Sequence, residues 1–171
     1  WLIEEKKAIK EFVVNLKKPY LGFCLGCQLL GEVIGGKVVK SNPAEIGIMD
    51  INFTKEKNED ILFSKFPEQI KSLQWHSYEV HDLPSNTNLL ASSPECKVQA
   101  FSSNNAFGLQ FHVEQTNDTV PQWACVPEYK SALEKTLGAN ALEKFKKDVQ
   151  DNLGLFNNSA RTIYNNFKKI I

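Results

Sequence analysis

The residues Gly22-Phe23-Cys24-Leu25-Gly26 join a strand-like segment to a helix-like segment with no loop between them. Pro19–Phe23 is a short apolar run of the type that forms buried strands. After Cys24, apolar residues recur at helical spacing until Gly35-Gly36, where a helix is expected to end. A strand that passes directly into a helix makes a sharp turn, and glycines two positions either side of Cys24 leave room for it. The pattern therefore predicts a strand–turn–helix unit with Cys24 at its turn.

The rest of the chain shows a helical pattern before Cys24, a series of strand patterns after the helix that follows Cys24, and helical patterns at its C-terminal end. Residues 3–16 have the apolar spacing of a helix that Pro19 terminates. The expected strands are 37–40, 46–53, 71–75, 88–92, 98–101 and 106–111. Residues 128–171 are expected to be a helical C-terminal extension, with Ser159 as the cap of a last helix. We predict one α/β domain over 1–171, with an open, mostly parallel, flavodoxin-like sheet flanked by helices.

Composition limits the classes of function. Apolar residues make up 42% of the 171 residues, which supports one sizeable core rather than two domains. The 20 basic and 20 acidic residues balance, so the chain lacks the basic surface of a nucleic-acid binder. No apolar run reaches the roughly 18 residues that a membrane span needs. We expect a cytoplasmic protein that binds neither nucleic acid nor membrane.

The cysteine pattern is open to two interpretations. Cys24 and Cys27 have the C-x-x-C spacing of redox and zinc sites. No second pair at ligand spacing follows, and His76, His81 and His112 are scattered along the chain. We therefore favour reduced intracellular thiols and no metal site.

Cys24 is the candidate nucleophile. At a strand–helix turn its thiol would project from the carboxyl end of the strand, where open α/β sheets bind their ligands. The backbone N–H of Leu25, at the start of the helix, could hold an oxyanion. The alternative is that the glycines surround a small buried cysteine for packing reasons alone.

A nucleophilic cysteine needs a base, and the base needs an acceptor that orients it. His112 ends an apolar strand in Gly108-Leu109-Gln110-Phe111-His112, and Glu114 follows two residues later. In extended backbone those two side chains share a face, so Glu114 can accept from the imidazole. His76 and His81 show no comparable carboxylate partner at a strand end. His112 as a purely structural histidine remains the alternative.

These segments resemble those of the class I (triad-type) glutamine amidotransferases. Residues 19–38 resemble the cysteine segment of that family, and Gly108–Glu114 resembles its histidine–glutamate segment. Gln74–Val80 is similar to the loop that helps to hold glutamine, and Glu45-Ile46-Gly47 also fits. Within the family the chain looks most similar to stand-alone domains of the GMP synthase type.

The resemblance implies an acyl transfer in which Cys24 attacks the side-chain amide of glutamine, His112 is base and then acid, and Glu114 orients His112. It implies Leu25 as an oxyanion donor through its backbone. The implied glutamine contacts are Gly22, Gln28, His76, Ser77 and Tyr78. It implies no metal and no cofactor.

Three departures from the family bear on this expectation. Val113 stands where proline is usual, and Tyr78 stands where an acidic residue is common, which affects how the substrate ammonium is held. The family also has strands and a glycine-rich loop ahead of the cysteine strand, so we expect N-terminal βα units to be missing here. The stretch after Glu114 is too short for an ATP-using synthetase, so the ammonia acceptor is expected to be a separate chain.

Other functions remain open from the sequence. The same triad could serve a hydrolase of γ-glutamyl peptides. The fold could instead be an inactive binding or regulatory module. A cysteine-elbow protein of the stress-response type would not need Gln28 or the His112 segment.

Overall fold

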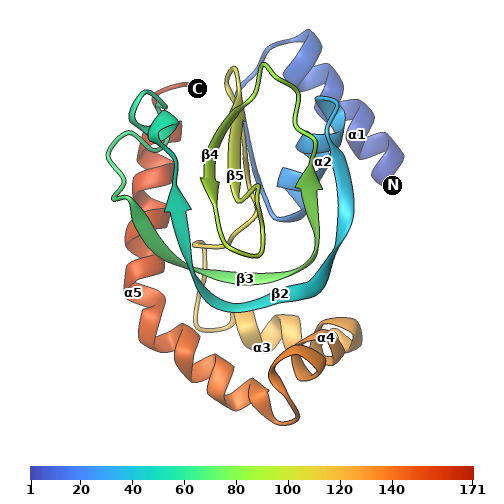
Figure 1. Cartoon of the computed structure of the whole chain (residues 1–171), viewed down its shortest axis with the longest axis vertical. Coiled ribbons are helices and arrows are strands. Elements are labelled where there is room, and N and C mark those ends of the chain that lie inside the picture. The colour runs from blue at the N-terminus through green and yellow to red at the C-terminus, as the bar shows by residue number, and fades with distance from the viewer.

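A computed structural model describes all residues, 1–171, as helices packed around one six-stranded sheet (Figure 1). The strands are β1 (Tyr20–Phe23), β2 (Lys37–Phe53), β3 (Gln69–His81), β4 (Asn88–Ser92), β5 (Ala100–Ser103) and β6 (Ala106–Leu109). The helices are α1 (Leu2–Lys10), η1 (Glu11–Asn15), α2 (Leu25–Val33), η2 (Lys55–Asn58), α3 (Thr119–Ala124), α4 (Pro127–Leu137) and α5 (Ala141–Phe167). The α/β class and the flanking helices are confirmed.

The sheet is mixed, whereas we expected mostly parallel strands. Its order is β1-β6-β5-β4-β2-β3, and only the β1–β6 pair is parallel. From β2 onward no long helix separates consecutive strands. Parallel neighbours need a crossover of a dozen or more residues, whereas antiparallel neighbours can be joined by short turns. β5 and β6 follow this rule, because only Asn104 and Asn105 join them, whereas β2 and β3 are antiparallel although residues 54–68 separate them.

The expected strands 37–40 and 46–53 form one long strand, β2. It pairs with β3 along most of its length, and the two curl together beneath β4 and β5 in the view of Figure 1. The register shifts between Lys40 and Glu45, in the segment that contains Pro43. Proline has no N–H for the ladder and is accommodated at such irregularities. The break that the sequence indicated is thus a bulge within one strand.

Two apolar clusters lie on the two sides of the sheet. The larger contains 22 buried residues and includes the inner faces of α4 and α5. The smaller contains eight buried residues and lies under α1 and α2. The sheet that carries Cys24 and His112 is therefore covered on both faces, which holds its strand ends in place.

The C-terminal helix is longer than the sequence indicated. α5 runs without interruption for 27 residues, so Ser159 lies inside it and caps no helix. Phe145, Val149, Phe156 and Ile163 form its buried face, and Asn166 donates through Nδ2 to the carbonyl oxygen of Leu62 at 2.9 Å. This continuous apolar stripe outweighs the local preference of Ser159 for a helix start. None of the helices has the combination of length and apolarity that crossing a bilayer requires.

Candidate functional site

Cys24 lies at the turn between β1 and α2, as the sequence predicts. Its φ of 46° and ψ of −102° lie in a region that non-glycine residues seldom adopt. The backbone N–H of Cys24 donates to the carbonyl oxygen of Leu109 at 2.8 Å, which ties the turn to β6. A side chain at Gly22 would place its Cβ 2.5 Å from the carbonyl carbon of Gly26. The turn therefore needs a glycine at position 22.

The one parallel pair of the sheet brings Cys24 and His112 to the same edge. Phe23 of β1 is opposite Leu109 of β6, so the residues that follow each strand leave the sheet side by side. His112 then exchanges two backbone hydrogen bonds with Leu73 of β3, at 2.9 and 3.0 Å. These bonds fix the backbone that carries the imidazole next to the Cys24 turn.

Glu114 orients the ring of His112 directly. Nδ1 of His112 lies 2.6 Å from Oε1 of Glu114, and Oε2 of Glu114 accepts from the backbone N–H of Val113 at 2.9 Å. The Trp123 ring packs edge-on against the imidazole, with ring centroids 4.8 Å apart. With Nδ1 committed to the carboxylate, Nε2 is the nitrogen left for chemistry.

The pKa values of this pair shift in opposite directions. Burial lowers the pKa of His112, but interactions with Cys24 and Glu114 outweigh burial and raise it to about 9. Burial raises the pKa of Glu114, but its hydrogen bond with His112 outweighs burial and holds the pKa below its ordinary value. Both shifts favour a protonated imidazole beside a carboxylate. The structure thus brings Cys24, His112 and Glu114 into one cluster.

Leu25 begins α2, and Gln28 lies one turn into that helix. The first N–H groups of a helix have no acceptor within it, so the Leu25 N–H is free of intrahelical pairing. The side-chain nitrogen Nε2 of Gln28 donates to the carbonyl oxygen of Tyr78 at 2.8 Å and to Oε1 of Gln110 at 3.1 Å. Gln28 therefore links the α2 turn to β3 and to the strand that leads to His112.

The residues expected to hold glutamine on β3 do not all face the Cys24 cluster. The carbonyl of Tyr78 is already occupied by Gln28 and by Nδ1 of His76, at 2.8 and 3.0 Å. The Tyr78 side chain is half exposed. Ser77 lines a cavity of about 490 Å³ together with Lys40 and Lys135, next to the bulge of β2.

His76 does have a carboxylate partner, contrary to our expectation. Its Nε2 lies 2.9 Å from Oε2 of Glu45, and both side chains are almost completely buried. Glu45 and His76 are directly opposite each other in the β2–β3 ladder, although they are distant in the sequence. His81 also has a partner, Glu79, at 3.1 Å. Motif reading along one strand missed Glu45 because the pairing depends on cross-strand register.

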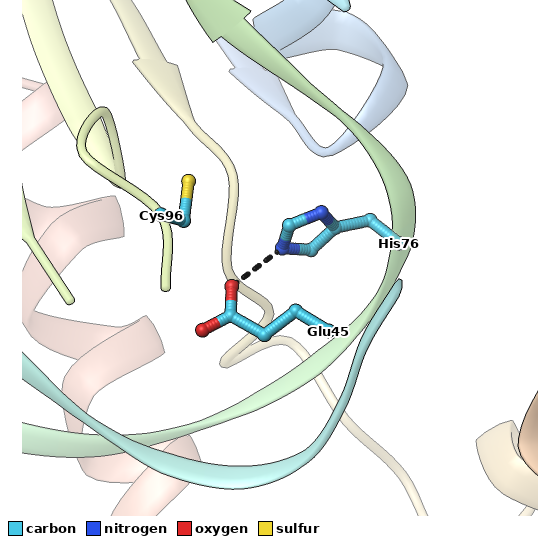
Figure 2. Close-up of side chains that lie close together, drawn as sticks. All are labelled: Glu45, His76 and Cys96. Atoms are coloured by element: carbon cyan, nitrogen blue, oxygen red, sulfur yellow. Dashed lines mark hydrogen bonds and ion pairs between the residues drawn. The ribbon is translucent and has the colours of Figure 1, made fainter. Parts of the chain in front are cut away.

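Figure 2 shows Glu45 and His76 pointing toward each other, with the thiol of Cys96 nearby. One ligand atom of each residue lies within 4.8 Å of the others. Glu45 also accepts from Ser93 at 3.0 Å and from Gln99 at 2.9 Å. Burial and the neighbouring carboxylates raise the pKa of the Cys96 thiol, which keeps it protonated. Glu45 and His76 thus have hydrogen-bond partners within the protein, and the Cys96 thiol donates to the carbonyl oxygen of Val98 at 3.5 Å.

Gln110 is a site residue to which the sequence analysis gave no role. Its Nε2 lies 3.6 Å from Sγ of Cys24, and its side chain is completely buried. The sequence spacing could have indicated this role, because positions 110, 112 and 114 alternate along an extended segment and so share one face. All four cysteines, including Cys24 and Cys27, are free thiols.

Comparison with known proteins supports the family resemblance that the motifs indicated. Residues 2–121 match the family model described as glutamine amidotransferase class-I. A glutamine-hydrolyzing GMP synthase subunit from Sulfolobus acidocaldarius is 41% identical over 106 residues, which cover 61% of this chain and 55% of that protein. The corresponding protein from Saccharolobus solfataricus is 41% identical over 105 residues, 60% of this chain and 54% of that protein. The chain spans about half the length of these curated relatives.

The fold also resembles a solved structure over nearly its whole length. A glutamine amidotransferase from Thermotoga maritima superposes with a TM-score of 0.82 at 27% identity. The superposition covers 97% of this chain and 69% of that one, so it includes the C-terminal helices that the family model leaves out. On the match over residues 2–121, this chain belongs to the class I glutamine amidotransferase family.

Proposed function

We propose that this chain carries the glutamine-hydrolysing site of a class I amidotransferase, with Cys24, His112 and Glu114 as its triad. The observation that carries the proposal is the 2.6 Å contact between His112 and Glu114, together with a His112 pKa that Cys24 and Glu114 raise to about 9. A structural histidine would not need a thiol on one side and a carboxylate on the other.

The proposed reaction has two stages. The Cys24 sulfur attacks the side-chain carbonyl carbon of glutamine while His112 holds the thiol proton, and the Leu25 N–H donates to the resulting oxyanion. The C–N bond then breaks, and His112 gives its proton to the departing ammonia. Water attacks the γ-glutamyl thioester with His112 as base, which releases glutamate and restores the thiol. The candidate glutamine contacts remain Gly22, Gln28 and the 76–78 segment, and Gln28 is joined to Gln110 beside the Cys24 sulfur.

We further propose that the ammonia passes to a synthetase on a separate chain. The relatives of this chain are described as one subunit of GMP synthase, which supports a division of labour between two chains. No step of glutamine hydrolysis by these residues needs a cofactor. Mixing the chain with an ATP-using synthetase of the GMP synthase type, and testing for glutamine-dependent amination, checks the proposal.

The test of the hydrolytic function compares ammonia release from glutamine by the wild type and by Cys24→Ala. We expect the substitution to abolish release while the fold, followed by circular dichroism, is kept. Equal release from both proteins would contradict the assignment. Cys125→Ala is the matched control, because Cys125 is an exposed thiol at the end of the short helix α3 and outside the cluster.

A second candidate, hydrolysis of γ-glutamyl peptides, is favoured by Tyr78. Its half-exposed side chain stands at the position where the family often has an acidic residue. At this position the chain therefore has no negative charge to bind the ammonium group of free glutamine. Rates with glutamine and with a γ-glutamyl dipeptide separate the two functions. Faster cleavage of the dipeptide would favour the peptidase.

A further inference from the structure

The amide of Gln110 has each of its two ends next to a different residue of the site. Its oxygen Oε1 accepts from Nε2 of Gln28 at 3.1 Å, and its nitrogen Nε2 lies 3.6 Å from Sγ of Cys24. The side chain has no exposure to solvent. Water therefore cannot replace either contact, and both ends of the amide depend on these neighbours.

The orientation of this amide is fixed by its neighbour. Gln28 uses the hydrogens of Nε2 for two acceptors, the carbonyl oxygen of Tyr78 and Oε1 of Gln110. A flipped Gln110 would present its NH₂ to the NH₂ of Gln28, which pairs two donors. The nitrogen of Gln110 must therefore face the sulfur of Cys24.

The same chain of hydrogen bonds continues to the buried Glu45–His76 pair of Figure 2. The Tyr78 carbonyl that anchors Gln28 also accepts from Nδ1 of His76, and Nε2 of His76 is held by Glu45. Hydrogen bonds from Ser93 and Gln99 in turn hold the Glu45 carboxylate. Because these groups are buried, the position of Gln110 is set by a rigid network that extends from β2 to the Cys24 turn.

We propose that Gln110 is a positioning residue for the amidotransfer reaction: its N–H holds the Cys24 sulfur in place and favours the thiolate, and its oxygen locks Gln28 beside it. The inference rests on the proposed function, because it concerns the same sulfur. An N–H donor is bound more strongly by a charged acceptor than by a neutral one, so this contact stabilises the anionic sulfur relative to the thiol. The pairing also links the nucleophile to Gln28, the residue that the family resemblance assigns to substrate glutamine.

Two substitutions separate the donor from the shape of the side chain. Gln110→Met keeps the length of the side chain and removes both hydrogen bonds. Gln110→Glu keeps an oxygen for Gln28 and replaces the donor beside Cys24 with a second acceptor. If positioning acts through the N–H, both variants lower the reactivity of the Cys24 thiol. The glutamate variant lowers it more, because a carboxylate repels a thiolate.

Gln74→Met is the matched control. Gln74 is also completely buried, and its Nε2 donates to Oε1 of Gln99 at 2.9 Å, but it has no contact with Cys24. Because Gln99 also holds Glu45, the control removes an amide of the same network and leaves the donor beside the sulfur in place. Cys125, an exposed thiol, provides an internal reference for reagent reactivity in every variant.

The experiment measures alkylation of Cys24 by iodoacetamide over a range of pH in the full chain, with peptide mass spectrometry to separate Cys24 from Cys125. We expect Gln110→Met to slow the alkylation of Cys24 relative to that of Cys125 by roughly three- to tenfold at neutral pH. We also expect the pH of half-maximal alkylation to rise in both Gln110 variants and to stay unchanged in Gln74→Met.

Equal Cys24-to-Cys125 ratios in Gln110→Met, Gln110→Glu and Gln74→Met would overturn the proposal and leave Gln110 a packing residue. If Gln110→Met does not fold, the glutamate variant decides alone, since it keeps the bond to Gln28. Alkylation needs no glutamine, so the result is independent of turnover. If the Gln110 variants show the expected loss of Cys24 alkylation but the wild type releases no ammonia from glutamine, the proposed function is contradicted and the positioning role is not.

Discussion

Nδ1 of His112 lies 2.6 Å from Oε1 of Glu114, two residues further along the same segment. This contact fixes the ring and leaves Nε2 as the nitrogen that is not paired with the carboxylate. It follows from the extended backbone after β6, where alternate side chains share a face. The chemistry we propose depends on this short-range pairing and on the parallel β1–β6 pair that brings Cys24 to the same edge.

Replacing Glu114 with glutamine should impair turnover and change its pH dependence. Glu114 helps to raise the pKa of His112 to about 9, so its loss lowers that pKa. We expect ammonia release by the wild type to fall above about pH 9, where the imidazole no longer carries the proton for the leaving group. In Glu114→Gln the rate should drop by roughly 10²-fold or more, and the alkaline limb should move to lower pH. An unchanged alkaline limb would argue against Glu114 as the orienting group.

The same pKa shift predicts how His112 contributes to stability. Its folded-state pKa of about 9 lies above the ordinary value of 6.5, so protonation favours the folded state. The contribution is complete below pH 6.5 and is lost as the pH rises through about 9. Urea unfolding of the wild type and His112→Gln should show a wild-type advantage that shrinks over that interval. A difference that is constant with pH would contradict the shift.

Breaking the buried Glu45–His76 pair from one side should strongly destabilise the folded protein. Both side chains are at most 3% exposed, so removing one partner leaves the other buried and unpaired. We expect His76→Ala to lower the free energy of unfolding by about 3–5 kcal/mol. The control is Asp82→Asn, which breaks the exposed pair of Lys37 and Asp82 and should leave the urea midpoint nearly unchanged. Equal effects of the two substitutions would contradict the burial argument.

Two glycine substitutions should act in opposite directions. In Gly22→Ala the new Cβ would lie 2.5 Å from the carbonyl carbon of Gly26, so the turn must distort, at a cost of about 1–3 kcal/mol. In Gly154→Ala the new Cβ meets nothing within 4 Å on α5, so the helix should gain about 0.5–1 kcal/mol. Thermal unfolding of both variants checks the pair. A stabilised Gly22→Ala would mean that the turn is less crowded than described.

The local parts of the site could be predicted from the sequence, because each depends on residues within one short segment. The Cys24 turn follows from its glycines, and the pairing of His112 with Glu114 follows from their separation by two positions. Glu45 as the partner of His76 could not be predicted, because it depends on the register between β2 and β3. The antiparallel part of the sheet and the uninterrupted α5 were also missed, since tertiary packing decided both.

The most direct test of the central claim is to look for the covalent intermediate on Cys24. The wild type is mixed with glutamine, quenched in acid within the first turnover, digested and analysed by mass spectrometry. We predict a γ-glutamyl group on the peptide that contains Cys24, absent from Cys24→Ala and from samples without glutamine. Ammonia release by the wild type without any γ-glutamyl adduct on Cys24, or an adduct on another residue, would contradict the account.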